Sequence, residues 1–161
     1  GTIKDEMSIS KTPLKRSKEL QSFSREHHHG LLLCSKIGKG IRKGIETDRI
    51  WNYVAHFYQN SLIAHFEDEE KYVFPVLGND HELVKKALSE HRRLHRLFAD
   101  KTQMARSISL IEEELEAHIR FEERVLFPEI QKIATEEQLQ TIEEYHTEIE
   151  ACVDWKDEFW K

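Results

Sequence analysis

Apolar residues recur every three or four positions along most of the chain, the spacing that places them on one face of an α-helix. Stretches with this period are predicted to begin near residues 22, 47, 80, 107 and 135. Short polar or glycine-containing segments separate them, and short connections make consecutive helices antiparallel neighbours. The pattern therefore predicts an all-α protein, an up-and-down antiparallel four-helix bundle with an additional C-terminal helix.

Local sequence signals set the predicted helix ends. The first helix is expected to end in the glycine-rich stretch GKGIRKG (residues 38–44). The second and fourth helices are expected to end at Pro75 and Pro128, because proline lacks a backbone donor and its ring clashes with the preceding turn. The last helix is predicted to start at Thr135, where T-E-E-Q forms a capping box, and to reach the aromatic end WKDEFW (residues 155–160).

The first residues lack the helical period. Residues 1–16 are polar and contain Pro13, so we predict an N-terminal arm followed by one helical domain over residues 17–161. A chain of 161 residues is long enough to bury a single substantial core, which favours one domain.

Charge and composition narrow the classes of partner. The formal net charge is -6 and the pI is near 5.9, a balance that argues against nucleic acid. No apolar run approaches the ~20 residues that span a membrane. Two cysteines do not make a disulfide framework, which favours a cytoplasmic location. The aromatic end suits packing against the bundle or against a partner, so we expect a monomer or a weak dimer.

One sequence pattern occurs twice, in AHFEDEEKYVFP (residues 64–75) and AHIRFEERVLFP (residues 117–128). In both copies a His precedes a Glu by four residues, and residues four apart lie on one helix face about one turn apart. The apolar stripes of both helices run through these positions. His65 with Glu69, and His118 with Glu122, are therefore predicted to face the core.

Histidines on two other predicted helices are also expected to face the core. The third apolar stripe passes through His91 and His95, which are four residues apart. In the triplet of the first helix, His27 has apolar neighbours at helical spacing, whereas His28 and His29 have polar ones. We therefore choose His27 from the triplet, with His28 as the alternative.

Together these positions are candidate metal ligands: His27, His65, Glu69, His91, His95, His118 and Glu122. A single His on an apolar stripe is more often a core residue with a hydrogen-bond partner than a ligand. So many polar groups in one small core would leave too little hydrophobic stabilisation unless a cation compensates them. The set therefore predicts metal ligation.

The donor types indicate which metal ions suit the site. The ligands exceed the four of a tetrahedral zinc site, and calcium or magnesium prefers oxygen donors. Imidazoles and carboxylates suit two first-row metal ions, with iron the leading candidate and manganese or zinc as alternatives. Two carboxylates on opposite helices can bridge ions about 3.5–4 Å apart.

Other polar or reactive residues are assigned to structural roles. His146 lies on the apolar stripe of the last helix and is predicted to pack outside the four-helix core, with a role at the metal site as the alternative. Glu70 and Glu123, the second Glu of each repeat, are expected on flanking faces near Arg or Lys. Cys34 is predicted to be an inert buried thiol.

Four stretches in this order resemble the hemerythrin-like (HHE cation-binding) family: REHHHGLL, HFEDEEKYVFP, EHRRLH and HIRFEERVLFP. The resemblance covers about residues 20–130. It implies a four-helix bundle with a non-haem di-iron centre bridged by an oxo or hydroxo group. Carried over by position, the ligands divide into three His on one iron, two His on the other and two bridging carboxylates: His91, His95 and His118; His27 and His65; and Glu69 and Glu122.

One position departs from the oxygen-carrying hemerythrins. Their last carboxylate is an Asp five residues after the His, whereas Glu122 follows His118 by four residues, as in the HHE subgroup. Glu123 has the five-residue spacing but is expected to face away from the core. The departure weakens an assignment as an oxygen carrier.

The unequal division of the histidines bears on function. An iron with two His ligands keeps an open coordination position, which admits a small ligand. We therefore predict a non-enzymatic protein that binds dioxygen or a related small ligand such as nitric oxide, for storage or sensing. The alternatives are an iron-handling protein, a di-iron oxidase or peroxidase, and a bundle that holds another cation for structure.

Overall fold

The computed structural model describes residues 15–150 and 154–161, and every regular element in these two ranges is helical. The longer helices are α2 (Gln21–Arg42), α3 (Thr47–Phe57), α4 (Ile63–Asp68), α5 (Glu82–Ala99), α6 (Met104–Phe121), α7 (Phe127–Ile133) and α8 (Glu136–Tyr145). Short 3₁₀ turns, η1 (Lys18–Leu20) and η5 (Lys101–Gln103), precede α2 and α6. The all-α prediction is thus confirmed for the described residues. Of the predicted N-terminal arm, residues 1–14 lie outside them.

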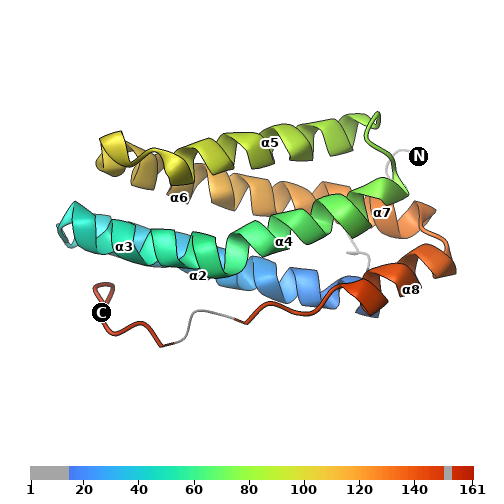
Figure 1. The fold of residues 1–161 in the computed structure, drawn as a ribbon, viewed down its shortest axis with the longest axis horizontal. Helices are drawn as coiled ribbons and strands as arrows, with labels where there is room; N and C mark the ends of the chain where they lie inside the picture. The colour runs from blue at the N-terminus through green and yellow to red at the C-terminus, as the bar shows by residue number, and fades with distance from the viewer. Residues whose placement is uncertain (1–14, 151–153) are drawn as a thin grey trace, which may run out of the picture.

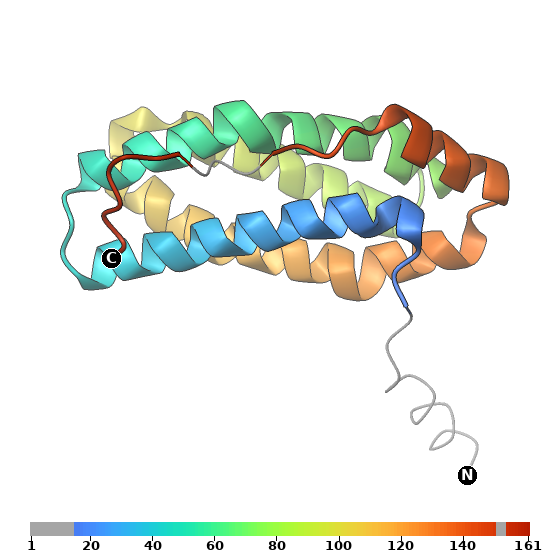
Figure 2. The same cartoon turned by 90° about the horizontal axis from the view of Figure 1, so that it is seen from below.

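Four helical rods lie side by side along the long axis of the molecule (Figures 1 and 2). The first rod is α2 and the third is α5. The second runs from α3 through a π-helical turn, η2 (Tyr58–Leu62), into α4, then through a second π turn, η3 (Glu69–Val73), into a 3₁₀ turn, η4 (Phe74–Val76). The fourth joins α6 to α7 through another π turn, η6 (Glu122–Leu126). Within this arrangement α6 packs against both α2 and α5.

The first helix ends at Arg42, inside the predicted stretch GKGIRKG, although it continues through Gly38 and Gly40, two of the three glycines expected to supply the stop signal. Gly38 and Gly40 are buried inside α2 because other side chains approach them closely. A Cβ on Gly38 would lie 2.4 Å from Oε2 of Glu112, and one on Gly40 would lie 2.9 Å from the ring of Phe159. The helix ends at Arg42, and Gly44 then adopts the left-handed backbone, with φ at 69°, that terminates helices.

The fourth rod does not stop at Pro128 as predicted. The backbone N–H of Phe127 donates to the carbonyl of Glu122 five residues earlier, which is the hydrogen bond of a π turn. The next helix starts there, so Pro128 lies in the first turn of α7, where a backbone donor is not needed. In the second rod the regular structure ends at Val76, one residue beyond Pro75.

The last helix starts as predicted but is shorter. The capping box at Thr135 is formed, yet α8 ends at Tyr145, and residues 146–150, here called the C-terminal segment, have no regular structure. At the end of α8, His146 adopts an extended backbone because its side chain bonds to other helices. Figure 2 shows the C-terminal segment lying along the first two rods. Further on, Phe159 is buried against Tyr53.

Buried apolar side chains form two clusters, one toward each end of the rods. One cluster, which includes Ile37, Trp51 and Phe98, lies near the α2–α3 connection. The other, which includes Phe23 and Phe74, lies near α8. Between the two clusters every rod contributes a buried His, so a polar layer crosses the middle of the bundle.

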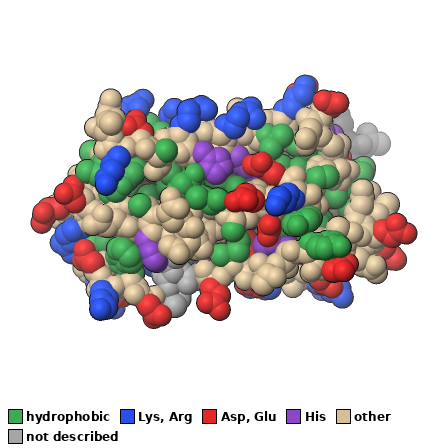
Figure 3. Space-filling model, viewed as in Figure 1, with side chains coloured by type: hydrophobic (Ala, Val, Ile, Leu, Met, Phe, Trp, Pro, Cys, Tyr) green, Lys and Arg blue, Asp and Glu red, His purple; other side chains and the backbone are tan. Residues whose placement is uncertain are grey.

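The surface does not alter the expectations on partners. On the face shown in Figure 3, Lys and Arg side chains are interspersed with Asp and Glu. Among the described residues, none of the helices has an apolar stretch that could span a membrane. The exclusion of nucleic acid and the cytoplasmic location stay predictions.

Candidate metal centre

Six of the seven predicted ligands meet in the polar layer. Their donor atoms form two overlapping groups, and within each group all the donor atoms lie within 4.8 Å of one another. One group is His27, His65, Glu69 and Glu122, and the other is Glu69, His91, His118 and Glu122. All six residues are at most 3% exposed. Of the histidine triplet on α2, His27 is the one that reaches the layer.

The two copies of the repeat deliver their ligands in the same way. The Nε2 atom of His65 lies 3.2 Å from Oε2 of Glu69, and the Nε2 atom of His118 lies 3.1 Å from Oε2 of Glu122. In both copies the Glu is the first residue of a π turn, η3 or η6. Such turns occur frequently at functional sites because they shift the side chains of one helical turn.

The two glutamates are shared between the histidine pairs. Glu69 directs Oε2 toward His27, at 3.2 Å, and Oε1 toward His91, at 3.1 Å. Glu122 directs Oε1 toward His27, at 2.8 Å, and Oε2 toward His91, at 3.5 Å. Each carboxylate therefore presents one oxygen to each half of the layer, as a carboxylate that bridges two metal ions does.

Several donor atoms in this layer are buried without a hydrogen-bond partner. They are Nε2 of His65, Nε2 of His91, Nε2 of His118, Oε1 of Glu69 and both side-chain oxygens of Glu122. These atoms face one another at ion-pair distances but without the directions of hydrogen bonds. A buried polar atom left unpaired costs about 1–3 kcal/mol. Metal ions bound to the two groups would accept the lone pairs of all of these atoms, so the residues present fit a metal centre.

A second ring of acidic side chains surrounds the four imidazoles. Each ring nitrogen Nδ1 faces one carboxylate oxygen at 2.5–2.7 Å. The pairs are His27 with Glu123, His65 with Glu26, His91 with Glu70, and His118 with Glu90. We call Glu26, Glu70, Glu90 and Glu123 the outer carboxylates. Because a carboxylate accepts the Nδ1 proton, each imidazole is held with Nε2 directed at the centre, as in many protein metal sites.

These outer carboxylates were missed or misassigned from the sequence. Glu123 does contact Arg16, as expected of a flanking residue, but it also binds His27. Glu70, likewise assigned to a flanking face, binds His91. A sequence signal existed, because every outer carboxylate is the immediate neighbour of a predicted ligand. The spacing could not show that each one binds a His on a different rod.

His95 is the predicted ligand that the structure does not bring to the centre. Its Nδ1 atom lies within hydrogen-bond distance of the Tyr58 hydroxyl, and the side chain is only partly buried. The ring of Phe66 stacks on His91 at 3.9 Å and meets His95 edge-on at 5.4 Å. The three-and-two division of histidines implied by the resemblance stays a prediction, and the structure gathers His27 with His65, and His91 with His118, around the two glutamates.

The buried carboxylates of the layer favour positive charge beside them, either as protonated imidazoles or as bound cations. Burial works against charged imidazoles, but Glu122, Glu123 and Glu69 together raise the pKa of His27 well above its ordinary value. For His65, burial is likewise outweighed by Glu69 and Glu26, which raise its pKa to about 9. Burial also opposes the charge on Glu122, yet His118 and its other partners hold the pKa of that carboxyl well below its ordinary value. Without a metal ion, the layer therefore balances its carboxylates with imidazole protons.

His146 joins this network although it is not a ligand. Its Nδ1 atom lies 2.7 Å from Asp68 and its Nε2 atom 2.8 Å from Glu26, the outer carboxylate of His65. Burial alone would raise the pKa of Glu26, but hydrogen bonds from His146, His65 and the N–H of Ile149 lower it to about 2. The ring of His146 stacks on the ring of Phe23. His146 thus lies just beyond α8, in contact with the surroundings of the site.

Cys34 lies in the apolar cluster beside α3, where burial raises the pKa of its thiol to about 12. A thiol with this pKa remains protonated at neutral pH, in agreement with an inert residue. Cys152 lies outside the described residues.

We compared the chain with protein-family models, with curated proteins and with solved structures, and none of the three comparisons found a match.

Proposed function

We propose that this chain is a hemerythrin-like protein, an up-and-down antiparallel four-helix bundle that holds two metal ions and binds dioxygen or a related small ligand such as nitric oxide. Iron is the leading candidate, with manganese or zinc as alternatives. The observation that carries the proposal is the set of buried nitrogen and oxygen atoms that converge on the middle of the bundle without hydrogen-bond partners.

The donor set divides evenly between two ions. His27 and His65 would hold one ion, His91 and His118 the other, with Glu69 and Glu122 shared. Each ion then receives four protein donors, fewer than the six that iron usually takes, so positions remain for a small ligand. A pair of iron ions would supply the redox chemistry that dioxygen binding requires.

The protein's own side chains would orient the ligands and keep bulk water away. The outer carboxylates hold the Nδ1 protons of the four imidazoles and so fix the direction of each Nε2 atom. The two apolar clusters close the layer from both ends of the bundle. This combination favours a small ligand over bulk water at the centre.

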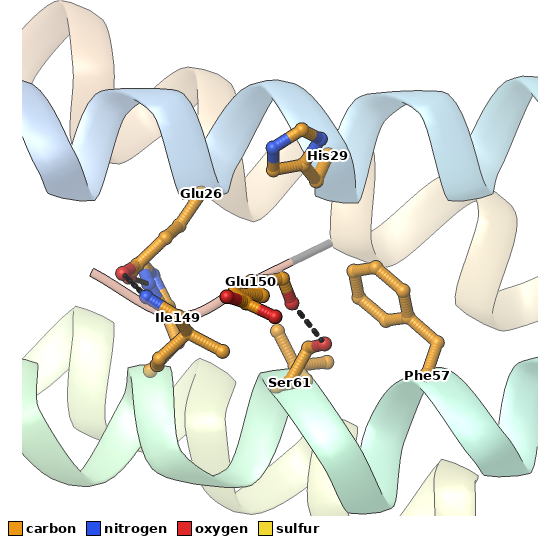
Figure 4. A pocket seen from close by; sticks show the side chains of 8 residues that line it. Glu26, His29, Phe57, Ser61, Ile149 and Glu150 are labelled. Carbon is orange, nitrogen blue, oxygen red and sulfur yellow. Dashed lines mark hydrogen bonds and ion pairs between the residues drawn. The ribbon is translucent and has the colours of Figure 1, made fainter. Parts of the chain in front are cut away.

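The space beside the centre also favours a small ligand. A pocket between α2 and the second rod is lined by Glu26, Ser61, His65 and Ile149, among others (Figure 4). Its interior of about 20 Å³ has room for roughly one water molecule. A diatomic molecule suits this size better than the organic substrate of an oxidase.

The test is metal analysis of the purified protein followed by anaerobic loading with ferrous iron and exposure to oxygen. We expect about two ions per chain and a visible charge-transfer band that appears with oxygen and disappears when oxygen is removed. The His118→Ala variant should lose the band. One tightly bound zinc ion per chain, with no iron uptake, would contradict the proposal.

A further inference from the structure

The two halves of the centre follow one pattern of contacts. On α2 and α5 an outer carboxylate directly precedes a ligand, as Glu26–His27 and as Glu90–His91. In each case that carboxylate crosses to the His of a repeat, since Glu26 binds His65 and Glu90 binds His118. The second Glu of each repeat contacts a His on the next rod, so Glu70 binds His91 and Glu123 binds His27. The halves are therefore related by an approximate twofold pattern.

The pattern breaks at Glu26 and Glu90. The side chain of Glu26 is 5% exposed, whereas that of Glu90 is 28% exposed. Oε2 of Glu26 accepts hydrogen bonds from Nε2 of His146 and from the backbone N–H of Ile149, each at 2.8 Å. Glu90 instead pairs with Lys86, a half-exposed side chain on its own helix. Only the first half of the centre thus has an outer carboxylate held by the C-terminal segment.

The C-terminal segment is itself fixed to the first two rods. Asp68 accepts from Nδ1 of His146, and the hydroxyl of Ser61 donates to the carbonyl of Glu150. Glu148 pairs with Arg25 on α2. Figure 4 shows the segment passing between the two rods, with Glu26 reaching down to Ile149 and Ser61 reaching up to Glu150. These contacts leave Glu26 little freedom to rotate.

We propose that the C-terminal segment is part of the metal centre: His146 and Ile149 hold Glu26, Glu26 orients His65, and the ion held by His27 and His65 therefore binds more tightly than the other. This inference rests on the two-metal function proposed above. The physical reason is that a ligand whose supporting carboxylate is already fixed loses less freedom on binding a divalent cation. An exposed Lys pair such as Lys86–Glu90 provides little such fixing. His146 is a positioning residue, since it acts on the ion through Glu26 and His65.

The experiment titrates the metal-free full chain with Co²⁺, a divalent probe that is visible in absorption and stable in air, using calorimetry and d–d spectra. We expect two binding events of different affinity. His146→Ala should weaken the tighter event about 10- to 100-fold, the usual effect of removing an outer partner of a metal ligand, and change its spectrum. His146→Gln keeps a side-chain N–H for Glu26 and should restore much of the affinity. Lys86→Ala is the matched control and should leave the tighter event unchanged.

The outcomes separate the two proposals. Wild-type protein that binds fewer than two Co²⁺ ions overturns the two-metal function and this inference with it. Two events of equal affinity, or a His146→Ala variant that weakens both events alike or neither, overturn this inference alone. Thermal unfolding of the metal-free variants reports whether the fold is intact. If His146→Ala does not fold, Ile149→Pro removes the other donor to Glu26 and should weaken the same event.

Discussion

Glu69 and Glu122 meet, fully buried, in the middle of the bundle, where the charge of Glu122 opposes ionisation of Glu69. Two buried carboxylates this close are costly unless cations lie between them or around them. The protein surrounds them with four imidazoles, whose Nδ1 atoms are already engaged by the outer carboxylates. The pair therefore explains both why the layer could hold metal ions and why it holds protons without them.

Replacing one shared carboxylate should lower both the metal affinity and the stability of the metal-free fold. In Glu122→Gln we expect metal affinity to fall by more than about 100-fold, since both ions lose a ligand. The metal-free protein should unfold at a lower temperature, because the protonated rings of His27 and His118 lose the buried carboxylate that balances their charge. Metal analysis and calorimetry measure the two effects. Glu129→Gln, on α7, is the control, and a Glu122→Gln variant that retains two ions would refute the assignment.

The two histidines of α5 should behave differently. His91→Ala is expected to lose at least one of the two bound ions, because Nε2 of His91 faces both shared carboxylates. His95→Ala should retain both ions, because its side chain bonds to Tyr58 instead. Measuring the metal content of the two purified variants tests this difference. Loss of metal in His95→Ala would restore the three-and-two ligand division implied by the family resemblance.

Metal binding should stabilise the fold more as the pH rises. In the metal-free fold the pKa of His65 is raised from 6.5 to about 9, so its proton contributes stability below pH 6.5 and this contribution is lost as the pH rises toward 9. Metal ions require the unprotonated ring, so their binding strengthens over the same interval. We expect the difference in Tm between metal-loaded and metal-free protein to grow from pH 6.5 to pH 9. Calorimetry at several pH values tests this, and a constant or shrinking difference would count against it.

Two glycines inside α2 should respond differently to alanine. A Cβ on Gly40 would press on the rings and methyl groups of Phe159 and Ile50 in the apolar cluster, which should cost about 1–3 kcal/mol. A Cβ on Gly38 would meet only the ends of Glu112 and Arg42 side chains, which can rotate away. The gain in helix propensity, about 1 kcal/mol, should then make Gly38→Ala neutral or stabilising. Urea unfolding measures both, and equal destabilisation would show that Glu112 cannot move.

Much of the candidate site follows from the helical period alone. The apolar stripes of two helices include His65, Glu69, His118 and Glu122. Because an apolar stripe faces the core, the polar residues on it face the core as well. His95 shows the limit of this argument. It lies on the same stripe as His91 but one turn further along the axis, and periodicity gives direction around a helix without giving the level at which the metal centre lies.

The other differences arise from contacts between rods. The first helix ends within the predicted stretch, but it continues through Gly38 and Gly40, and at Gly40 close packing against Ile50 and Phe159 requires a glycine. Likewise, nothing local to the apolar stripe of α8 shows that the helix ends at Tyr145. That end depends on His146 meeting Glu26 and Asp68, which are 120 and 78 residues away in the sequence.

The polar layer also separates the two ends of the bundle, and each end packs around its own apolar cluster. Because no apolar cluster crosses it in the described residues, packing at one end contributes little to packing at the other. In the metal-free protein we therefore expect two cooperative units, whose amide protons exchange with solvent at different rates. Ions that bind ligands from all four rods would join these units mechanically, so metal loading decides whether the chain unfolds in one step or two.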